Sequence, residues 1–153
     1  LVTGVVTWVD IYKQVVKKPG IEQRLKELSQ NLPADPREPV VIANPIEFVQ
    51  WSHYAGAELR PRLVYVASIE DSMSLNESDT LDRALLGVRS LLPSRIVEYR
   101  QFAEQAPRFR MVLPHDSWQF KKVLQDKATI TAVGILRGEP VYEVVYRPDR
   151  SSR

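Results

Sequence analysis

Two short, uninterrupted apolar runs constrain the fold of this chain more than any other feature of its sequence. Residues 40–43 read Val-Val-Ile-Ala, and residues 63–67 read Leu-Val-Tyr-Val-Ala. A run without alternation is typical of a strand that is buried on both faces of a parallel sheet. The stretch between the runs is long enough for a helical crossover, which joins parallel strands. The two runs therefore predict parallel strands inside a sheet.

Helical and strand patterns alternate along the rest of the chain. An apolar stripe predicts a helix over residues 21–32, and Asn44 as N-cap with Pro45 in the first turn predicts a second helix that ends at Gly56. The elements expected after residue 67 are a loop at 68–78, a helix at 79–92, a strand at 95–98, a helix at 99–106, a strand at 109–113 and a helix that runs from Asp116 or Ser117 through Lys127. The side chains expected on the buried face of the 79–92 helix are Leu81, Ala84, Leu85, Val88 and Leu92.

The end of the chain predicts a β-hairpin. Residues 128–136 and 141–146 are β-rich and flank Arg137-Gly138-Glu139-Pro140, which has the composition of a four-residue hairpin loop. Alternating strands and helices followed by a hairpin predict an α/β fold: a three-layer Rossmann-like domain whose mostly parallel sheet ends in an antiparallel hairpin. Right-handed crossovers with a topological switch beside the first strand favour the strand order 3-2-1-4-5-6.

The length of 153 residues fits one domain. We expect residues 1–20 to be the end of a transmembrane or connecting helix, residues 21–147 to form a single α/β domain, and residues 148–153 to be a tail. Trp8 and Tyr12 precede Lys13, Lys17 and Lys18, which is the order found where a helix leaves a bilayer. A core helix or a strand with a basic exit explains the same residues, and a full span needs about 20 apolar residues.

Several classes of site are excluded by the sequence. The chain has no cysteine, so disulfides, thiolate metal sites and cysteine nucleophiles are absent. The net charge is +2 with both signs interspersed, which gives no indication of a nucleic-acid partner. The turn Ala43-Asn44-Pro45-Ile46 lacks the glycines of a dinucleotide site, and no Walker, G-x-S-x-G or H-E-x-x-H motif occurs. We therefore predict no cofactor and, because His53 and His115 lie far apart in sequence, no metal.

Ligands of such a fold bind at the carboxyl ends of the strands. The polar and ring-bearing residues expected there are Asn44, Ser68, Glu70, Tyr99, Pro114, His115 and Asp116, all ligand-binding candidates except Pro114. No catalytic residue is assigned. The run His115-Asp116-Ser117 places three catalytic residue types together, but adjacent residues seldom converge as a triad, and a helix cap explains the last two equally well. The aromatic residues Phe48, Trp51 and Tyr54 could line a groove, whereas the ordinary expectation is that they fill the core.

A resemblance runs through residues 39–146. The successive segments that carry it are Val40-Val41-Ile42-Ala43-Asn44-Pro45 with Phe48, His53-Tyr54-Ala55, Arg62-Leu63-Val64-Tyr65-Val66-Ala67, and Asp79-Thr80-Leu81-Asp82-Arg83-Ala84-Leu85, with Phe109 before a strand and Trp118 before a helix. This pattern resembles the soluble C-terminal region of bacterial polytopic membrane proteins related to family 39 glycosyltransferases, the dolichyl-phosphate-mannose protein mannosyltransferase-like group. In that family the catalytic acidic residues lie upstream in an early extracytoplasmic loop, and none of them is present in this chain.

Two functional hypotheses follow. The resemblance implies a noncatalytic extracytoplasmic domain on the bacterial inner membrane, partnered with the membrane-embedded part of the same chain and with glycan or polyprenyl-linked sugar machinery. Such a domain would aid acceptor recognition or position the catalytic part of a glycosyltransferase-like protein. The alternative is a self-contained soluble, cytoplasmic α/β domain that binds a small molecule or acts as a hydrolase at the strand ends, through residues such as Asn44, His115 and Asp116.

Overall fold

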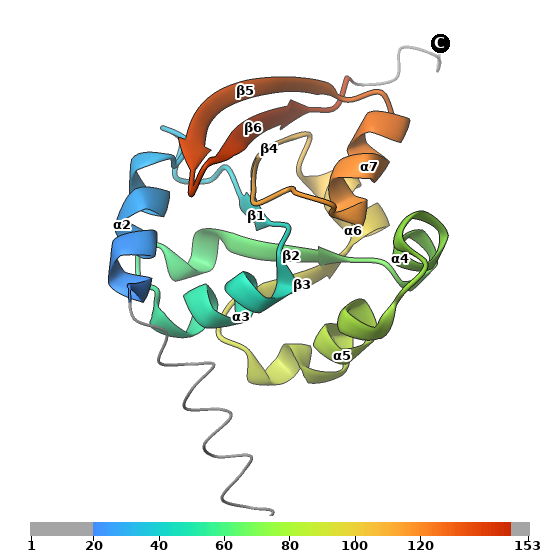
Figure 1. Cartoon of the computed structure of the whole chain (residues 1–153), viewed down its shortest axis with the longest axis horizontal. Coiled ribbons are helices and arrows are strands. Elements are labelled where there is room, and N and C mark those ends of the chain that lie inside the picture. Colours follow the sequence, from blue (N-terminus) through green and yellow to red (C-terminus); the bar gives the residue numbers. More distant parts are fainter. Residues whose placement is uncertain (1–19, 148–153) are drawn as a thin grey trace, which may run out of the picture.

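A computed structural model describes residues 20–147 of the chain (Figure 1). The predicted membrane-exit segment, apart from Gly20, and the predicted tail lie outside the described residues. Between residues 20 and 147, no helix has both the length and the apolar character needed to cross a bilayer.

Helices and strands alternate as the sequence predicts. The α-helices are α2 (Ile21–Gln30), α3 (Pro45–Tyr54), α4 (Ile69–Asn76), α5 (Thr80–Val88), α6 (Tyr99–Gln105) and α7 (Trp118–Gln125). The strands are β1 (Val40–Ile42), β2 (Leu63–Ala67), β3 (Arg95–Glu98), β4 (Arg108–Val112), β5 (Thr129–Leu136) and β6 (Glu139–Val145). Asn44 caps α3 as predicted, because its side chain accepts hydrogen bonds from the backbone N–H groups of Ile46 and Glu47.

The strands form one mixed sheet of order β3-β2-β1-β4-β6-β5. Strands β1 to β4 are parallel, and β6 and β5 continue the sheet in antiparallel pairing. The predicted order is right for the first four strands and wrong for the hairpin, since β6 and not β5 lies beside β4. The inner position suits β6 because its Val141 and Val144 are fully buried, whereas Leu136 is the only buried residue of β5. The α/β class with a mostly parallel sheet is confirmed.

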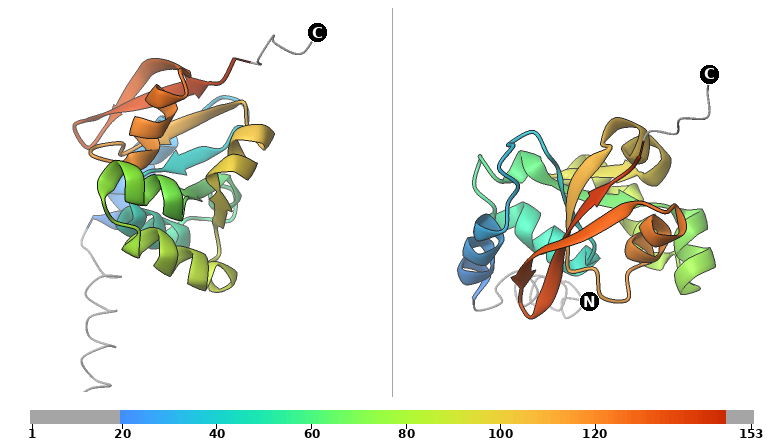
Figure 2. Two further views of the ribbon diagram at one scale, coloured as in Figure 1. Left: turned by 90° about the vertical axis from the view of Figure 1, so that its right-hand side faces the viewer. Right: turned by 90° about the horizontal axis from the view of Figure 1, so that it is seen from above.

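Helices cover both faces of the sheet (Figures 1 and 2). Val40 and Ile42 of β1 belong to one buried cluster with Phe48 and Trp51 of α3, while Val41 belongs to a second cluster that includes residues of α6 and α7. Phe48 and Trp51 are fully buried, so the core interpretation of these two rings is confirmed. Strands buried on both sides explain the uninterrupted apolar runs.

One predicted loop is a helix. Residues 68–78 contain α4, which begins after Ser68. The Ser68 hydroxyl accepts a hydrogen bond from the backbone N–H of Asp71 and donates one to the Asp71 carboxylate, 2.7 Å away. Farther along the helix, Lys121 of α7 donates to the backbone oxygen of Leu75 and to the side-chain oxygen of Asn76. The loop prediction was wrong because polar composition hid a capped helix that α7 stabilises.

The buried face of α5 also differs from the prediction. Leu81 is 51% exposed, whereas Asp82 is 3% exposed and Leu85 is 7% exposed. Ala84 and Val88, which the apolar stripe also assigned to this face, are exposed. The helix is therefore turned so that a carboxylate faces the sheet, which is tolerable because Asp82 has hydrogen-bond partners there.

The hairpin connection is tighter than predicted. Glu139 and Pro140 already belong to β6, so the turn itself consists of Arg137 and Gly138. Both residues have positive φ, 52° and 80°. This backbone combination is the one that matches the twist of two-residue hairpins.

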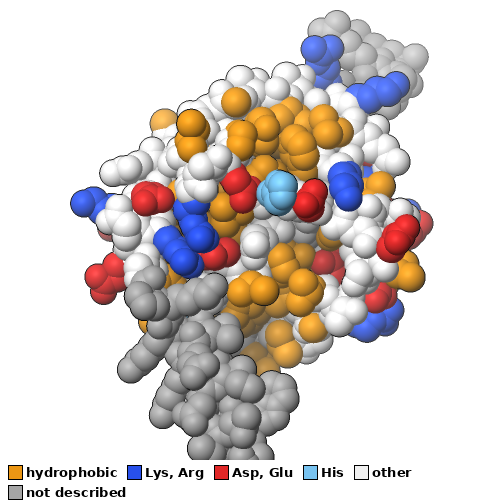
Figure 3. All heavy atoms as spheres, in the orientation of Figure 1, with side chains coloured by type: hydrophobic (Ala, Val, Ile, Leu, Met, Phe, Trp, Pro, Cys, Tyr) orange, Lys and Arg blue, Asp and Glu red, His pale blue; other side chains and the backbone are white. Residues whose placement is uncertain are grey.

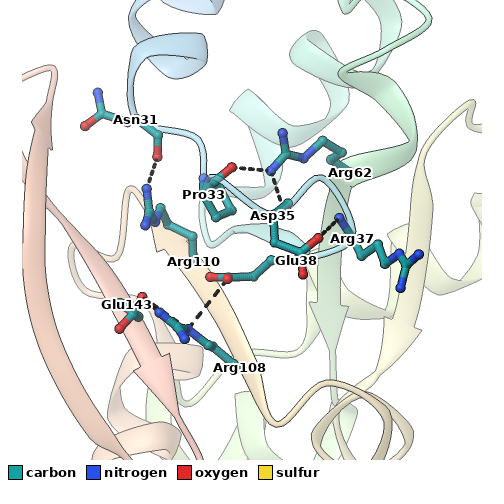
Figure 4. A network of polar contacts seen from close by, with 9 residues as sticks. All are labelled: Asn31, Pro33, Asp35, Arg37, Glu38, Arg62, Arg108, Arg110 and Glu143. Carbon is teal, nitrogen blue, oxygen red and sulfur yellow. Dashed lines mark hydrogen bonds and ion pairs between the residues drawn. The ribbon is translucent and has the colours of Figure 1, made fainter.

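The amino-terminal edge of the sheet is closed by arginine contacts (Figure 4). Arg62, which precedes β2, donates to the backbone oxygens of Pro33 at 2.9 Å and Asp35 at 3.0 Å. Arg110 of β4 donates to the backbone oxygen of Asn31 at 2.7 Å. These bonds hold the proline-rich connection between α2 and β1 against the amino-terminal ends of the strands.

Candidate functional site

The carboxyl ends of β1 and β4 form a topological switch point. The two strands are neighbours in the sheet, yet α3 follows β1 on one face and α7 follows β4 on the other. Chains that diverge in this way leave a crevice at the strand ends, where ligands of open α/β sheets bind. A cleft of about 240 Å³, the switch-point cleft, occupies this place. Its lining residues are Ala43, Asn44, Pro45, Tyr65, Asn76, Ser78, Leu81, Asp82, His115, Asp116, Ser117, Trp118 and Gln119.

A buried carboxylate and a buried phenol lie in the wall of the switch-point cleft. The Tyr65 hydroxyl donates to the Asp82 carboxylate at 2.7 Å, and the backbone N–H of Ser68 donates to the other Asp82 oxygen at 2.8 Å. Burial raises the pKa of Asp82, and the Ser68 and Tyr65 hydrogen bonds offset part of that rise. Burial, followed by the charge of Asp82, raises the pKa of Tyr65. Both groups are thereby biased toward their neutral forms.

The start of α7 contributes two further buried polar side chains. Gln119 is 2% exposed and donates its amide to the backbone oxygen of Val66 at 3.0 Å. Trp118 is 3% exposed, and its indole N–H makes no hydrogen bond of full geometry within the described residues. A weaker hydrogen bond from the indole to Tyr65 and Asp82 lowers the pKa of both groups. The buried indole N–H of Trp51, in the core, likewise makes no hydrogen bond of full geometry within the described residues.

The rim of the cleft is polar and exposed. His115 Nε2 lies 3.1 Å from Asp116 Oδ2, and the two side chains are 76% and 85% exposed. The side-chain amide of Asn76 donates to the backbone oxygen of Asp116 at 2.9 Å, which ties the end of α4 to the loop after β4. Asn44 faces the cleft from the start of α3. The cleft therefore combines a buried polar wall with an exposed polar rim.

A second cleft lies at the carboxyl ends of β2 and β3. This flank cleft, about 630 Å³, has residues of α4, α6 and α7 among its lining and includes Ser68, Glu70 and Tyr99. The Tyr99 hydroxyl donates to Asp126 at 2.5 Å and also contacts the Tyr146 hydroxyl. Burial, followed by the bond to Asp126, raises the pKa of Tyr99. Tyr99 is thus engaged in joining α6 to α7 and β6.

The six candidate residues do not share one cleft, and His115 and Asp116 also line a third cleft of about 300 Å³ beside Phe120 and Tyr142. Those in the switch-point cleft are Asn44, His115 and Asp116, and those in the flank cleft are Ser68, Glu70 and Tyr99. Only Ser68 connects the two, through its backbone N–H on Asp82. The structure therefore does not assemble the six into one site.

Sequence reasoning missed the buried polar wall. The sequence pattern assigns Tyr65 only to a strand and Asp82 only to the first turn of a helix. The signals present in the sequence are a tyrosine inside an otherwise aliphatic strand and an aspartate within the apolar part of an amphipathic helix. Neither signal identifies a partner, because Tyr65 and Asp82 meet only through the packing of α5 on β2.

The loop after β4 is a helix cap and not an assembled triad. The Ser117 hydroxyl accepts the backbone N–H of Phe120 at 3.2 Å, as an N-cap does. Within residues 20–147, no hydrogen bond joins the His115 imidazole to a serine hydroxyl. The same part of the chain contains no group of three or more His, Asp or Glu side chains arranged to hold a metal ion.

The chain was compared with protein families, curated proteins and solved structures, and none of them matches it.

Proposed function

We propose that this chain is a noncatalytic extracytoplasmic domain of a glycosyltransferase-like membrane protein, and that it binds a saccharide of the acceptor in the switch-point cleft. The domain would then help to recognise the acceptor or position the membrane-embedded catalytic part of the same protein. In this proposal the domain is Rossmann-like in its use of the sheet but binds no dinucleotide, since the turn after β1 has no glycine.

The observation that carries the proposal is the buried indole N–H of Trp118. Trp118 lines the cleft at the switch point, and its indole N–H makes no hydrogen bond of full geometry among the described residues, although a weaker hydrogen bond to Asp82 and Tyr65 lowers the pKa of both groups. A buried donor without a full hydrogen bond costs up to about 1–3 kcal/mol, so a ligand oxygen that accepts from it would gain up to that amount back. Sugar hydroxyls are suitable because each one both accepts and donates.

The remaining groups of the cleft suit a polyhydroxylated ligand. Asn44, His115 and Asp116 present amide, imidazole and carboxylate groups at the rim. Asp82 and Tyr65, whose pKa values burial raises, add a carboxyl group and a phenol to the wall of the cleft. A neutral polar molecule fits this combination better than an anion does. The membrane context of the proposal rests on the resemblance described above.

A truncation in the full-length membrane protein tests the accessory role. Deleting residues 21–153 is expected to lower sugar transfer to the acceptor while the membrane-embedded part still accumulates and binds its lipid-linked donor. Unchanged transfer and unchanged accumulation after the deletion would rule out the accessory role.

The two histidines offer a matched pair of point variants. His115→Ala alters the exposed rim of the cleft, whereas His53→Ala alters an exposed residue of α3 that is not among the cleft residues. We expect transfer at limiting acceptor concentration to fall in the first variant and not in the second. Equal effects of both variants would contradict acceptor binding at the switch-point cleft.

Hydrolysis is the second candidate, because the His115–Asp116 contact of 3.1 Å resembles the base and orienting carboxylate of a triad. This candidate predicts that the 153-residue chain cleaves an activated ester such as p-nitrophenyl acetate and that His115→Ala abolishes the cleavage. Cleavage at the rate of imidazole in solution would exclude it.

A further inference from the structure

Strand β5 is a long sheet edge with no charged side chain. It occupies one end of the sheet order, so one side of its backbone has no strand partner within the described residues. Its eight residues read TITAVGIL. Lysine or proline on an exposed edge strand hinders pairing with another strand, and a β-bulge does the same. Neither lysine nor proline occurs in β5, which has a bulge only between Ala132 and Gly134.

Apolar side chains accompany this edge. Val133 is 43% exposed and Ile135 is 72% exposed. Ile135 lies opposite Pro140, and Tyr142, two residues farther along β6, shares that face of the hairpin. Phe120 of α7 stacks on the Tyr142 ring at 5.0 Å. Figure 3 shows apolar side chains gathered over the upper part of this side of the molecule, where β5, β6 and α7 lie in Figure 1.

Two features limit how much of the edge is open. A bulge interrupts the β5–β6 register between Ala132 and Gly134. The side-chain amide of Asn31 donates to the backbone oxygen of Ile135 at 3.2 Å and so occupies an acceptor near the end of the strand. The open part of the edge is therefore Thr129–Ala132, with Val133 at its border.

We propose that this edge pairs with the same edge of a second copy of the chain. An antiparallel pairing of β5 with its own copy obeys a two-fold axis, as a closed dimer requires, and continues the sheet across both copies. Because the segment is uncharged, the two-fold axis brings no like charges together. Val133 and the hairpin face around Ile135 would then be buried against the second copy. This inference is independent of the ligand of the switch-point cleft.

The mass of the 153-residue chain in solution tests the proposal. Light scattering after size exclusion, at protein concentrations up to about 100 µM so that a dimer of micromolar affinity is populated, is expected to give twice the monomer mass of 17.5 kDa. Val133→Lys places a charge at the edge and is expected to give the monomer mass with an unchanged circular-dichroism spectrum.

Val88→Lys is the matched control, since Val88 of α5 is 40% exposed, close to the 43% of Val133, and lies outside the hairpin. We expect this variant to remain dimeric. Thr131→Lys, within the open part of the edge, provides a second disruption if Val133→Lys fails to fold. Three results would each overturn the proposal: a wild-type protein that is monomeric, a dimer that persists in the edge-strand lysine variants, or equal loss of the dimer in Val88→Lys. A monomeric wild type would leave this face to a different protein partner.

Discussion

Asp82 shows how a buried carboxyl group is accommodated at the carboxyl ends of the strands. Its side chain is 3% exposed and accepts one hydrogen bond from Tyr65 and one from the Ser68 backbone. The two bonds offset part of the cost of burial, and burial remains the largest influence on the pKa of Asp82. The residue therefore links the stability of the domain to pH.

Asp82→Asn should reveal this linkage. Burial raises the pKa of Asp82 in the folded protein above its ordinary value of 3.8. The contribution of Asp82 to stability is therefore complete below pH 3.8 and is lost as the pH rises through the folded-state pKa. We therefore expect the substitution to lower the free energy of unfolding more at pH 4 than at pH 7. Urea denaturation of both proteins at the two pH values measures the difference, and a loss that grows with pH would contradict the direction of the shift.

Trp118 and Tyr65 form a second test at the scale of single residues. Trp118→Phe removes a buried donor that makes no hydrogen bond of full geometry, so, apart from any cost of ring volume, the free energy of unfolding should stay unchanged or rise by up to about 1–3 kcal/mol. Tyr65→Phe removes the 2.7 Å bond to Asp82 and leaves a buried carboxylate oxygen without its donor, for an expected loss of about 1–3 kcal/mol. Chemical denaturation at pH 7 compares the two. A larger loss for Trp118→Phe would mean that its N–H is already satisfied in the folded protein.

At the scale of elements, the sequence predicts helices and strands best where residues close in sequence determine them. Asn44 and Pro45 determine the start of α3, and the apolar runs determine β1 and β2. Helix α4 was missed although Ser68 and Asp71 have the spacing of a capping box, because serine-rich composition favoured a loop. The rotation of α5 could not be read from its apolar stripe, since the decisive contacts of Asp82 come from β2 and from the residue after it.

Two glycines test the backbone of these elements. Gly138 has a φ of 80°, so Gly138→Ala strains the hairpin turn and should lower the free energy of unfolding by about 1 kcal/mol. Gly87 lies in α5, and no atom outside its own helical backbone and chain neighbours lies within 4 Å of the position that an alanine methyl group would take, so Gly87→Ala should raise the stability by about 0.4–1 kcal/mol. Thermal unfolding measures the stability of the two variants relative to the wild type. The turn geometry is contradicted if the Gly138 variant is as stable as the wild type.

At the scale of the whole molecule, the sequence predicts the class and the order of the four parallel strands but not the arrangement of the hairpin. Both hairpin strands are β-rich, and β5 is the less charged of the two, so composition gives no reason to place it outside. The strand order depends on long-range packing, since Val141 and Val144 of β6 are buried in the two core clusters on the two faces of the sheet. The two clefts could not be predicted from the sequence either, because each is lined by residues that are distant in sequence.

The most direct test of the proposed function follows the indole N–H signals of the ¹⁵N-labelled chain by NMR during titration with mannose, glucose, galactose and N-acetylglucosamine. Trp118→Phe assigns the Trp118 signal, and the fully buried Trp51, which lies in the core away from the cleft, serves as the internal control. We predict a saturable shift of the Trp118 signal with at least one sugar, no shift of the Trp51 signal, and loss of sugar binding in Trp118→Phe. An unmoved Trp118 signal with every sugar, or equal shifts at Trp118 and Trp51, would contradict saccharide binding at the switch-point cleft.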